Sequence, residues 1–286
     1  MKKRKLKMIN NYTITLAGGG MKGSFQIGAV KRLIEQFGQP EMISGCSAGA
    51  LNGALISSGQ FDELESLWLS LNEKNTLFPD FTFGMVQGLL FERSLKSNQK
   101  LISTIDTLLN WQLMKNTATT FLGVYSEVES GESKSFTNRN IDETLFKESL
   151  LASASIQPVY PATKVGSVWC GDGGYRNVIP VKELTELKDY EKIDKHFIIA
   201  AGILENTKYN YKNGNIFSDF LRVVDILFDE VTQNDLKKGN EKYWQKDSKY
   251  VLIAPEIQMI ETTESNNSKI RDNITYGYSI AKNIVG

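Results

Sequence analysis

Four glycines within six residues, at positions 18, 19, 20 and 23, follow a short stretch that is typical of a β-strand. Residues 13–16 alternate β-branched and apolar side chains, and the glycines after them predict the end of the strand. In residues 24–37 the apolar side chains recur at helical spacing, and Gly38 and Pro40 then end the pattern. A strand, a glycine loop and a helix in this order form the first unit of an α/β fold.

A second unit of the same kind begins at residue 42. A short apolar run is followed by the small-residue turn "GCSAG" at residues 45–49 and by a helix of Ala, Leu and Ile. Strands that alternate with helices favour a single α/β domain over residues 1–286, with a mainly parallel central sheet and helices on both faces. Further strands of this sheet are predicted at residues 120–124, 133–136, 197–200 and 250–253.

Two helical stretches have apolar residues that allow more than one interpretation. Residues 61–118 predict a helical insertion, which either packs in the core, as apolar segments usually do, or faces an apolar ligand. Residues 217–231 carry one apolar stripe at helical spacing, which favours a core-facing helix over a helix that lies on a membrane surface. The stripe consists of Phe217, Phe220, Leu221, Val224, Leu227, Phe228 and Val231.

Charge and hydropathy limit the partners and the compartment. The chain has 33 Lys and Arg against 33 Asp and Glu, so no net charge attracts nucleic acid, and no nucleic-acid partner is expected. The basic residues 1–10 lack the apolar core of a secretory signal and predict a mobile tail, and no apolar stretch is long enough to span a bilayer. The two cysteines, Cys46 and Cys170, favour a reducing compartment such as the cytoplasm, while export by a route without a cleavable signal stays open.

The glycine loop allows two interpretations. Gly18, Gly20 and Gly23 match the G-x-G-x-x-G pattern of dinucleotide-binding enzymes. That pattern requires an acidic residue at the end of the second strand, whereas Glu41 precedes that strand and small residues occupy its end. The alternative is a loop whose backbone N–H groups face an anion, including one that forms only in a transition state.

The turn at residues 45–49 supplies a nucleophile for the second interpretation. Gly45, Ser47 and Gly49 form G-x-S-x-G between a predicted strand and a predicted helix. In such an elbow a sharp turn exposes the serine hydroxyl above the sheet, and a side chain in place of either glycine would clash where the strand and the helix cross. The helix that begins after Ser47 also favours negative charge at that position.

The sequence offers two candidates for the base that would accept the proton of Ser47. His196 is the only histidine, and its place at the start of a predicted strand favours a surface or strand-edge residue over a catalytic one. Asp172 is flanked by glycines, among them Gly173 and Gly174, so its carboxylate can approach another backbone closely. An ordinary Asp-Gly turn is the simpler explanation of that run.

These three pieces, in this order, resemble the patatin-like phospholipases, a family of lipid acyl hydrolases with a Ser-Asp dyad. "GGGMKG" at residues 18–23 is similar to the oxyanion loop of the family, "GCSAG" to its nucleophile elbow, and "DGG" at residues 172–174 to its acid. The resemblance covers about residues 13–181. It implies a patatin-like fold related to the α/β-hydrolases, with phospholipids or lysophospholipids as substrates and with contact to a membrane surface.

Carried over residue by residue, the resemblance makes Ser47 the nucleophile and Asp172 the base. It assigns the oxyanion hole to Gly18, Gly19, Gly20, Met21, Lys22 and Gly23, with the N–H groups around Gly19, Gly20 and Met21 as donors. The supporting glycines are Gly45, Gly49, Gly173 and Gly174. No metal or organic cofactor is implied, since one histidine and two distant cysteines do not form an ordinary zinc site.

Two side chains near these motifs have more than one explanation. Cys46 is either a second nucleophile or small buried filler, and filler is favoured because thiolate chemistry needs an activating cation or base. Lys22 either orients the loop, meets a lipid phosphate or is simply solvated. For the whole chain, the alternatives to a lipid acyl hydrolase are a dinucleotide-binding enzyme and a catalytically silent lipid-binding module, and the need for an activator and the oligomeric state stay open.

Overall fold

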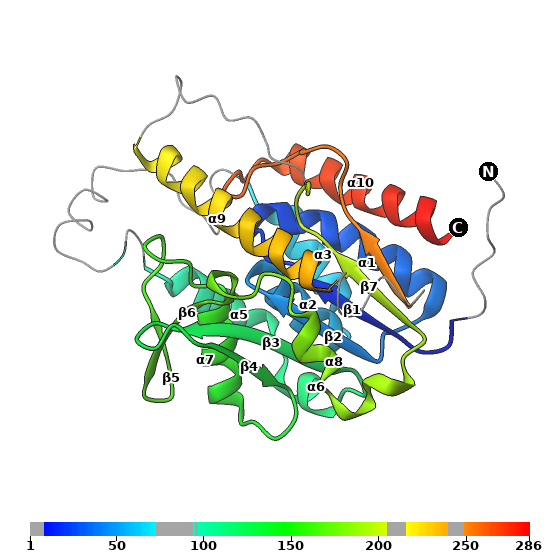
Figure 1. Ribbon diagram of the computed structural model, residues 1–286, viewed down its shortest axis with the longest axis horizontal. Coiled ribbons are helices and arrows are strands. Elements are labelled where there is room, and N and C mark those ends of the chain that lie inside the picture. Colours follow the sequence, from blue (N-terminus) through cyan, green and yellow to red (C-terminus); the bar gives the residue numbers. More distant parts are fainter. Residues whose placement is uncertain (1–8, 73–93, 95–96, 205–215, 240–248) are drawn as a thin grey trace.

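The computed structural model describes residues 9–72, 94, 97–204, 216–239 and 249–286, which form an eight-stranded sheet between helices (Figure 1). Seven strands lie in the order β5-β6-β3-β2-β1-β7-β8, and β4 pairs with β3. The strands are β1 (Tyr12–Leu16), β2 (Met42–Cys46), β3 (Thr120–Glu127), β4 (Ser133–Thr137), β5 (Thr163–Val165), β6 (Val168–Asp172), β7 (Lys195–Ile199) and β8 (Tyr250–Ile253).

Parallel pairing joins β3, β2, β1, β7 and β8, and the antiparallel strands β4, β5 and β6 lie at the β3 end of the sheet. Side chains alternate between the two faces, as strand geometry requires. In β2, Ile43 enters the large core on one face, whereas Met42 and Cys46 enter a smaller core on the other. The predicted α/β fold with a mainly parallel sheet is therefore confirmed.

Helices cover both faces of this sheet, as expected from the sequence. The large core lies under α1 (Ser24–Phe37), α2 (Ala48–Ser57), α3 (Phe61–Ser70), α5 (Gln99–Leu108), α6 (Trp111–Asn116), α7 (Glu143–Ser153) and α10 (Asn267–Val285). The opposite face packs against α8 (Val181–Thr185), the 3₁₀ turn η3 (Lys188–Lys192) and α9 (Ile216–Gly239).

The predicted insertion at residues 61–118 contains α3, α5 and α6, while its residues 73–93, 95 and 96 lie outside the described part of the chain. The inner sides of these helices join the large core through Leu64, Trp68, Leu101 and Ile105. Of the predicted basic tail, residues 1–8 likewise lie outside the described residues. None of the helices described here is both long enough and apolar enough to cross a membrane.

Helix α9 contacts the sheet with only part of its predicted apolar stripe. Val224, Phe228 and Val231 are half-buried, whereas Leu227 is 58% exposed and Ile226 beside it is exposed as well. The prediction that Leu227 faces the core is wrong, because α9 rests on the sheet along one narrow side and turns the other to solvent. The side chains of Phe217, Phe220 and Leu221 are outside the described part of the structure.

Helices α1 and α10 run side by side with their backbones in contact (Figure 1). A Cβ atom at Gly28 of α1 would overlap the carbonyl oxygen of Ile274, and a Cβ atom at Gly277 of α10 would overlap that of Phe25. One glycine from each helix therefore permits the crossing. Since α1 directly follows the glycine loop, this contact also fixes the direction in which the chain leaves that loop.

We expect Gly277→Ala to destabilise the protein, although alanine favours a helix over glycine by about 1 kcal/mol. The added methyl group overlaps the Phe25 carbonyl and forces the two helices apart, and overpacking of this kind costs about 1–3 kcal/mol. Thermal unfolding should show a midpoint several degrees below that of the wild type. Ser279→Ala, at an exposed position of the same helix, is the matched control; an unchanged midpoint for Gly277→Ala would contradict the tight crossing.

Candidate active site

Ser47 lies in a strained turn between β2 and α2. Its backbone angles are φ 54° and ψ −125°, a conformation that residues other than glycine rarely adopt. A Cβ atom at Gly45 would overlap the carbonyl of Gly49, and one at Gly49 would overlap the carbonyl of Leu16. The close approach of α2 to β1 and β2 therefore requires both glycines, in agreement with the elbow motif.

The pairing along β3 brings Asp172 to the same place. One edge of β3 pairs with β2 as far as Val124, opposite Cys46, and then with β6 from Tyr125, opposite Asp172. The other edge of β3 pairs with β4. The carboxyl ends of β2 and β6 therefore meet on one edge of β3, and Ser47 directly follows Cys46.

A contact that the motifs did not indicate holds the elbow. The N–H of Ser47 donates to Oγ of Ser153, the last residue of α7, at 3.1 Å. Two residues further, the carbonyl of Ser155 accepts a hydrogen bond from the N–H of Asp172 at 3.0 Å. The end of α7 and the two residues after it thus hold both halves of the candidate dyad in place.

The carboxylate of Asp172 is fully buried and only partly hydrogen-bonded. Its Oδ1 accepts the N–H of Gly174 at 2.8 Å and lies 4.0 Å from Sγ of Cys46. Its Oδ2 makes no well-formed hydrogen bond with any described residue. The hydroxyl of Ser47 lies within reach of the carboxylate and helps to lower its pKa. The site therefore combines a serine hydroxyl with a carboxylate that has a free acceptor oxygen.

Burial sets the protonation of this site. It raises the pKa of Asp172 to about 7, even though the N–H of Gly174 and the nearby hydroxyl of Ser47 act in the opposite direction. A carboxyl group with this pKa can exchange a proton near neutral pH, which suits a general base. Burial, and then the charge of Asp172, raise the pKa of the Cys46 thiol well above its usual value, which fits buried filler rather than a second nucleophile.

The glycine loop packs directly against the elbow and continues into the 3₁₀ turn η1 (Gly20–Gly23). A Cβ atom at Gly18 would lie 3.4 Å from Sγ of Cys46 and 3.4 Å from Cβ of Ser47. On the far side, a Cβ atom at Gly19 would lie 2.5 Å from Cβ of Ala201. The loop is thus held between Ser47 and the segment that follows β7.

The N–H groups of this loop differ in their hydrogen bonds. Those of Gly19 and Gly20 have no acceptor among the described residues. Three others are engaged: Gly18 donates to Val178 O at 3.1 Å, Met21 to Thr262 O at 2.8 Å and Lys22 to Gly19 O at 3.1 Å. Of these five N–H groups, those of Gly19 and Gly20 are therefore the ones without an acceptor in the described part of the chain.

Two pockets meet at Ser47, and Gly20 and Ala154 also line both of them. The first pocket is apolar and lies among α2, α3 and α5, with Leu51, Leu55, Trp68, Leu101, Ile105 and Leu108 in its wall. The second pocket is more polar and lies between the glycine loop and α9, with Lys22, Asp225, Asp229, Thr232 and Thr262 in its wall. The predicted insertion is therefore both part of the core and part of a pocket.

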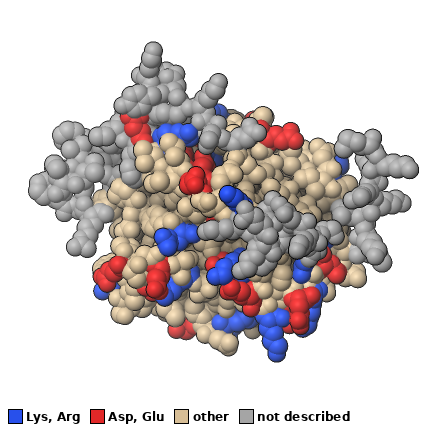
Figure 2. Space-filling model, in the orientation of Figure 1, with Lys and Arg blue, Asp and Glu red and all other residues tan. Residues whose placement is uncertain are grey.

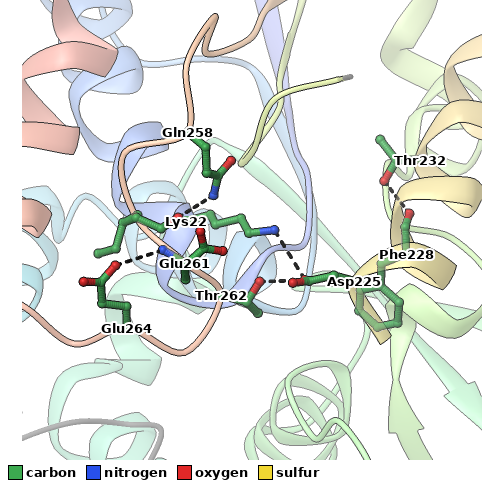
Figure 3. A network of polar contacts seen from close by, with 9 residues as sticks. Lys22, Asp225, Phe228, Thr232, Gln258, Glu261, Thr262 and Glu264 are labelled. Atoms are coloured by element: carbon green, nitrogen blue, oxygen red, sulfur yellow. Dashed lines mark hydrogen bonds and ion pairs between the residues drawn. The ribbon is translucent and has the colours of Figure 1, made fainter. Parts of the chain in front are cut away.

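Lys22 is not a solvated side chain, which was one of its three explanations. Its side chain is 14% exposed, and Nζ lies 3.4 Å from Oδ1 of Asp225 on α9 (Figure 3). The same oxygen accepts the hydroxyl of Thr262 at 2.7 Å. The sequence did not indicate Asp225 or Thr262, which lie more than 200 residues after Lys22 and belong to no motif.

The prediction of a surface or strand-edge position for His196 is wrong. His196 is fully buried in β7, where its Nε2 is hydrogen-bonded to Thr15 Oγ1 at 2.7 Å and its Nδ1 to Tyr190 Oη at 2.9 Å. Burial lowers its pKa to about 3. Thr13 of β1 lies opposite His196 on one side and opposite Met42 of β2 on the other. Met42 is five residues before Ser47, which corresponds to roughly 16 Å along the strand. His196 therefore lies away from the candidate dyad.

A family model for patatin-like phospholipases matches residues 14–185, which is 172 of the 286 residues. The chain belongs to the patatin-like phospholipase family. The matched segment contains the glycine loop, the elbow at Ser47 and the acid at Asp172, in agreement with the resemblance in the sequence. No curated protein matches the sequence.

Three solved structures are similar to this chain to different degrees. The crystal structure of VipD from Legionella pneumophila superposes with a TM-score of 0.54 at 11% identity, covering 98% of this chain and 67% of VipD. The type III effector protein ExoU has a TM-score of 0.43 at 12% identity, covering 96% of this chain and 52% of ExoU. ExoU from Pseudomonas aeruginosa in complex with SpcU has a TM-score of 0.40 at 14% identity, covering 98% of this chain and 53% of ExoU. At such identities the likeness to VipD concerns the fold alone.

The buried acid predicts an unusual dependence of stability on pH. Because folding raises the pKa of Asp172 from 3.8 to about 7, the native state binds more protons than the unfolded chain between these values, and the free energy of unfolding falls as pH rises through this window. Asp172→Asn removes the effect. From pH 4 to pH 8 the variant should therefore gain up to about 4 kcal/mol relative to the wild type, at about 1.4 kcal/mol per pKa unit. Urea unfolding at both pH values measures these free energies of unfolding. If the variant and the wild type differ by the same amount at pH 4 and at pH 8, the prediction is wrong.

Proposed function

We propose that this chain is a serine lipid acyl hydrolase, which cleaves fatty acyl esters of phospholipids or lysophospholipids. The observation that carries the proposal is the buried Asp172 carboxylate, which lies within reach of the hydroxyl of Ser47 and whose Oδ2 has no hydrogen-bond partner among the described residues. Family membership supports lipids as the substrate class. It favours this activity over dinucleotide binding through Gly18, Gly20 and Gly23.

In the proposed reaction, Asp172 accepts the proton of Ser47 while Ser47 Oγ forms a bond to the ester carbonyl carbon. The tetrahedral intermediate then expels the alcohol part of the lipid, which takes the proton back from Asp172. Water attacks the acyl-enzyme with Asp172 again as the base. The fatty acid leaves and Ser47 is restored, so water is the only co-reactant.

The negative charge on the former carbonyl oxygen would be stabilised by the glycine loop. Gly19 and Gly20 are the preferred donors, because their N–H groups have no acceptor among the described residues, whereas those of Gly18, Met21 and Lys22 are engaged. A donor of this kind typically contributes about 3 kcal/mol to the stability of the transition state. Since both groups are backbone N–H groups held in a tight loop, little reorganisation is needed when the charge forms.

The two pockets suggest how a lipid would lie across Ser47. We assign the acyl chain to the apolar pocket among α2, α3 and α5, because its wall consists mainly of Leu, Ile and Trp side chains. The glycerol and headgroup side of the ester would then lie in the polar pocket next to Lys22 and α9. The ester bond would lie at Ser47, where the two pockets meet.

Contact with a membrane surface and residence in the cytoplasm stay predictions. Val223, Ile226 and Leu227 form an exposed apolar strip on α9, which borders the polar pocket, and such a strip suits contact with lipid. Acidic and basic side chains are intermixed on the face in Figure 2. Attraction by the charges of that face would therefore contribute little to membrane contact.

A fluorophosphonate probe tests the proposed nucleophile, with intact mass as the readout. We expect one adduct on the wild type and none on Ser47→Ala, because only the activated serine reacts. Asp172→Asn should fold and label at least a hundredfold more slowly, since an amide cannot accept the serine proton. The labelling rate of the wild type should rise as pH increases through about 7, where Asp172 loses its proton.

His196→Gln serves as the control in this experiment, since it changes the histidine without touching the candidate dyad. Its labelling rate should stay within a few-fold of the wild type as long as the protein is folded. A wild type that folds but forms no adduct, with or without lipid vesicles, would favour the catalytically silent lipid-binding module. Full reactivity of Asp172→Asn would exclude Asp172 as the base.

Leu108→Trp tests the assignment of the acyl chain. Leu108 lines the apolar pocket and is only partly buried, so the larger ring should enter the pocket without unfolding the protein. Turnover of long-chain esters should fall by about tenfold relative to short-chain esters, since each excluded methylene forgoes about 0.8 kcal/mol. Leu113→Trp, at an exposed position of α6, is the matched control. An equal effect on all chain lengths would contradict the assignment.

A further inference from the structure

Helix α9 lies beyond the residues that the family model matches, yet it contacts the glycine loop. Oδ1 of Asp225 on this helix lies 3.4 Å from Nζ of Lys22, whose backbone belongs to the loop. Side-chain exposure is 14% for Lys22 and 20% for Asp225, so the ion pair is largely shielded from water and salt. The attraction between the two charges therefore acts on the loop itself.

A second link from Asp225 reaches the loop through Thr262. The hydroxyl of Thr262 donates to Oδ1 of Asp225 at 2.7 Å (Figure 3). The backbone carbonyl of Thr262 accepts the N–H of Met21 at 2.8 Å. One carboxylate oxygen thus holds the side chain of Lys22 and, through Thr262, the backbone of Met21. These two residues directly follow Gly20, which carries one of the free N–H groups.

The same helix also supports the other end of the loop. Oδ2 of Asp235 accepts the N–H groups of Val178 and Ile179 at 3.0 and 3.2 Å. The carbonyl of Val178 in turn accepts the N–H of Gly18 at 3.1 Å. Gly19 and Gly20 therefore lie between two points that carboxylates of α9 hold in place, one at Gly18 and the other at Met21 and Lys22.

We propose that Asp225 is a positioning residue, which holds the glycine loop so that the N–H groups of Gly19 and Gly20 point at the oxyanion. The proposal rests on the proposed function, because it assigns a role in that reaction. Asp225 itself does not touch the reacting atoms. It acts through Lys22 and Thr262, and its loss leaves the dyad of Ser47 and Asp172 intact.

The effect should appear in the chemical step rather than in substrate binding. A shift of catalytic groups by about 1 Å can lower a rate by about a hundredfold. Oxyanion donors act mainly in the transition state. We therefore expect Asp225→Ala to lower kcat by about ten- to a hundredfold, with KM for a soluble short-chain ester nearly unchanged. Asp225→Asn keeps an acceptor for Thr262 and loses the charge that attracts Lys22. Its kcat should therefore lie between that of the wild type and that of Asp225→Ala.

The experiment compares the wild type, Asp225→Ala, Asp225→Asn and Glu230→Gln in the chain of 286 residues. Glu230 is an exposed carboxylate on the same helix, and its substitution should change nothing. Three quantities are measured on each folded variant: kcat and KM for the soluble ester, the rate of fluorophosphonate labelling, and hydrogen exchange of the backbone in residues 18–23. Exchange in this segment should be fastest in Asp225→Ala and unchanged in Glu230→Gln.

The outcomes separate this proposal from the proposed function. A lower kcat with faster exchange in residues 18–23 supports it, whereas an unchanged kcat in a folded Asp225→Ala overturns it. A rise in KM alone overturns it too, because Asp225 would then serve substrate binding. If the wild type neither labels nor turns over esters, the proposed function fails, while faster exchange in Asp225→Ala still supports the holding of the loop by Asp225.

Discussion

The geometry of the candidate site depends on the backbone pairing along one edge of β3. Because β3 is longer than β2, the edge that pairs with β2 up to Val124 is free to pair with β6 from Tyr125 onward. This arrangement places the end of one parallel strand against the end of one antiparallel strand. Ser47 and Asp172 are 125 positions apart in the sequence, and two ladders of hydrogen bonds on one rigid strand bring them together.

Burial of the Asp172 carboxylate is the second constraint. It lowers the stability of the folded protein when the group is charged, but it also brings the pKa of the carboxyl group into the range that suits a general base. A charged group without full hydrogen bonding is costly in an apolar interior, so its pKa rises and the neutral form gains weight. Packing maintains this environment. Gly174 has no side chain, and the ring of Phe228 from α9 occupies the space that a Cβ atom would need. Helix α9 therefore also helps to keep water away from Gly174, two residues after Asp172.

The sequence predicts those parts of the molecule in which local chemistry decides the structure. The helix at residues 24–37 and the strand that ends at the glycine loop follow from spacing and from glycine, and both elbow glycines are needed for steric reasons that hold in any such turn. Burial that depends on distant partners was not predictable. His196 is buried because Thr15 and Tyr190 satisfy both ring nitrogens, and Lys22 is shielded because Asp225 meets it.

The segment that carries the family motifs does not make up the whole structural unit of this chain. Strand β1, which leads into the glycine loop, has β7 as one of its two neighbours, and β7 begins ten residues after the matched segment ends. Helix α1, which follows the loop, contacts α10 near the carboxyl end of the chain through Gly277. Without these elements, β1 would have a bare edge and α1 an exposed apolar face. The motifs therefore supply the glycine loop and the candidate dyad of Ser47 and Asp172, and the elements after residue 185 hold the glycine loop between β1 and α1.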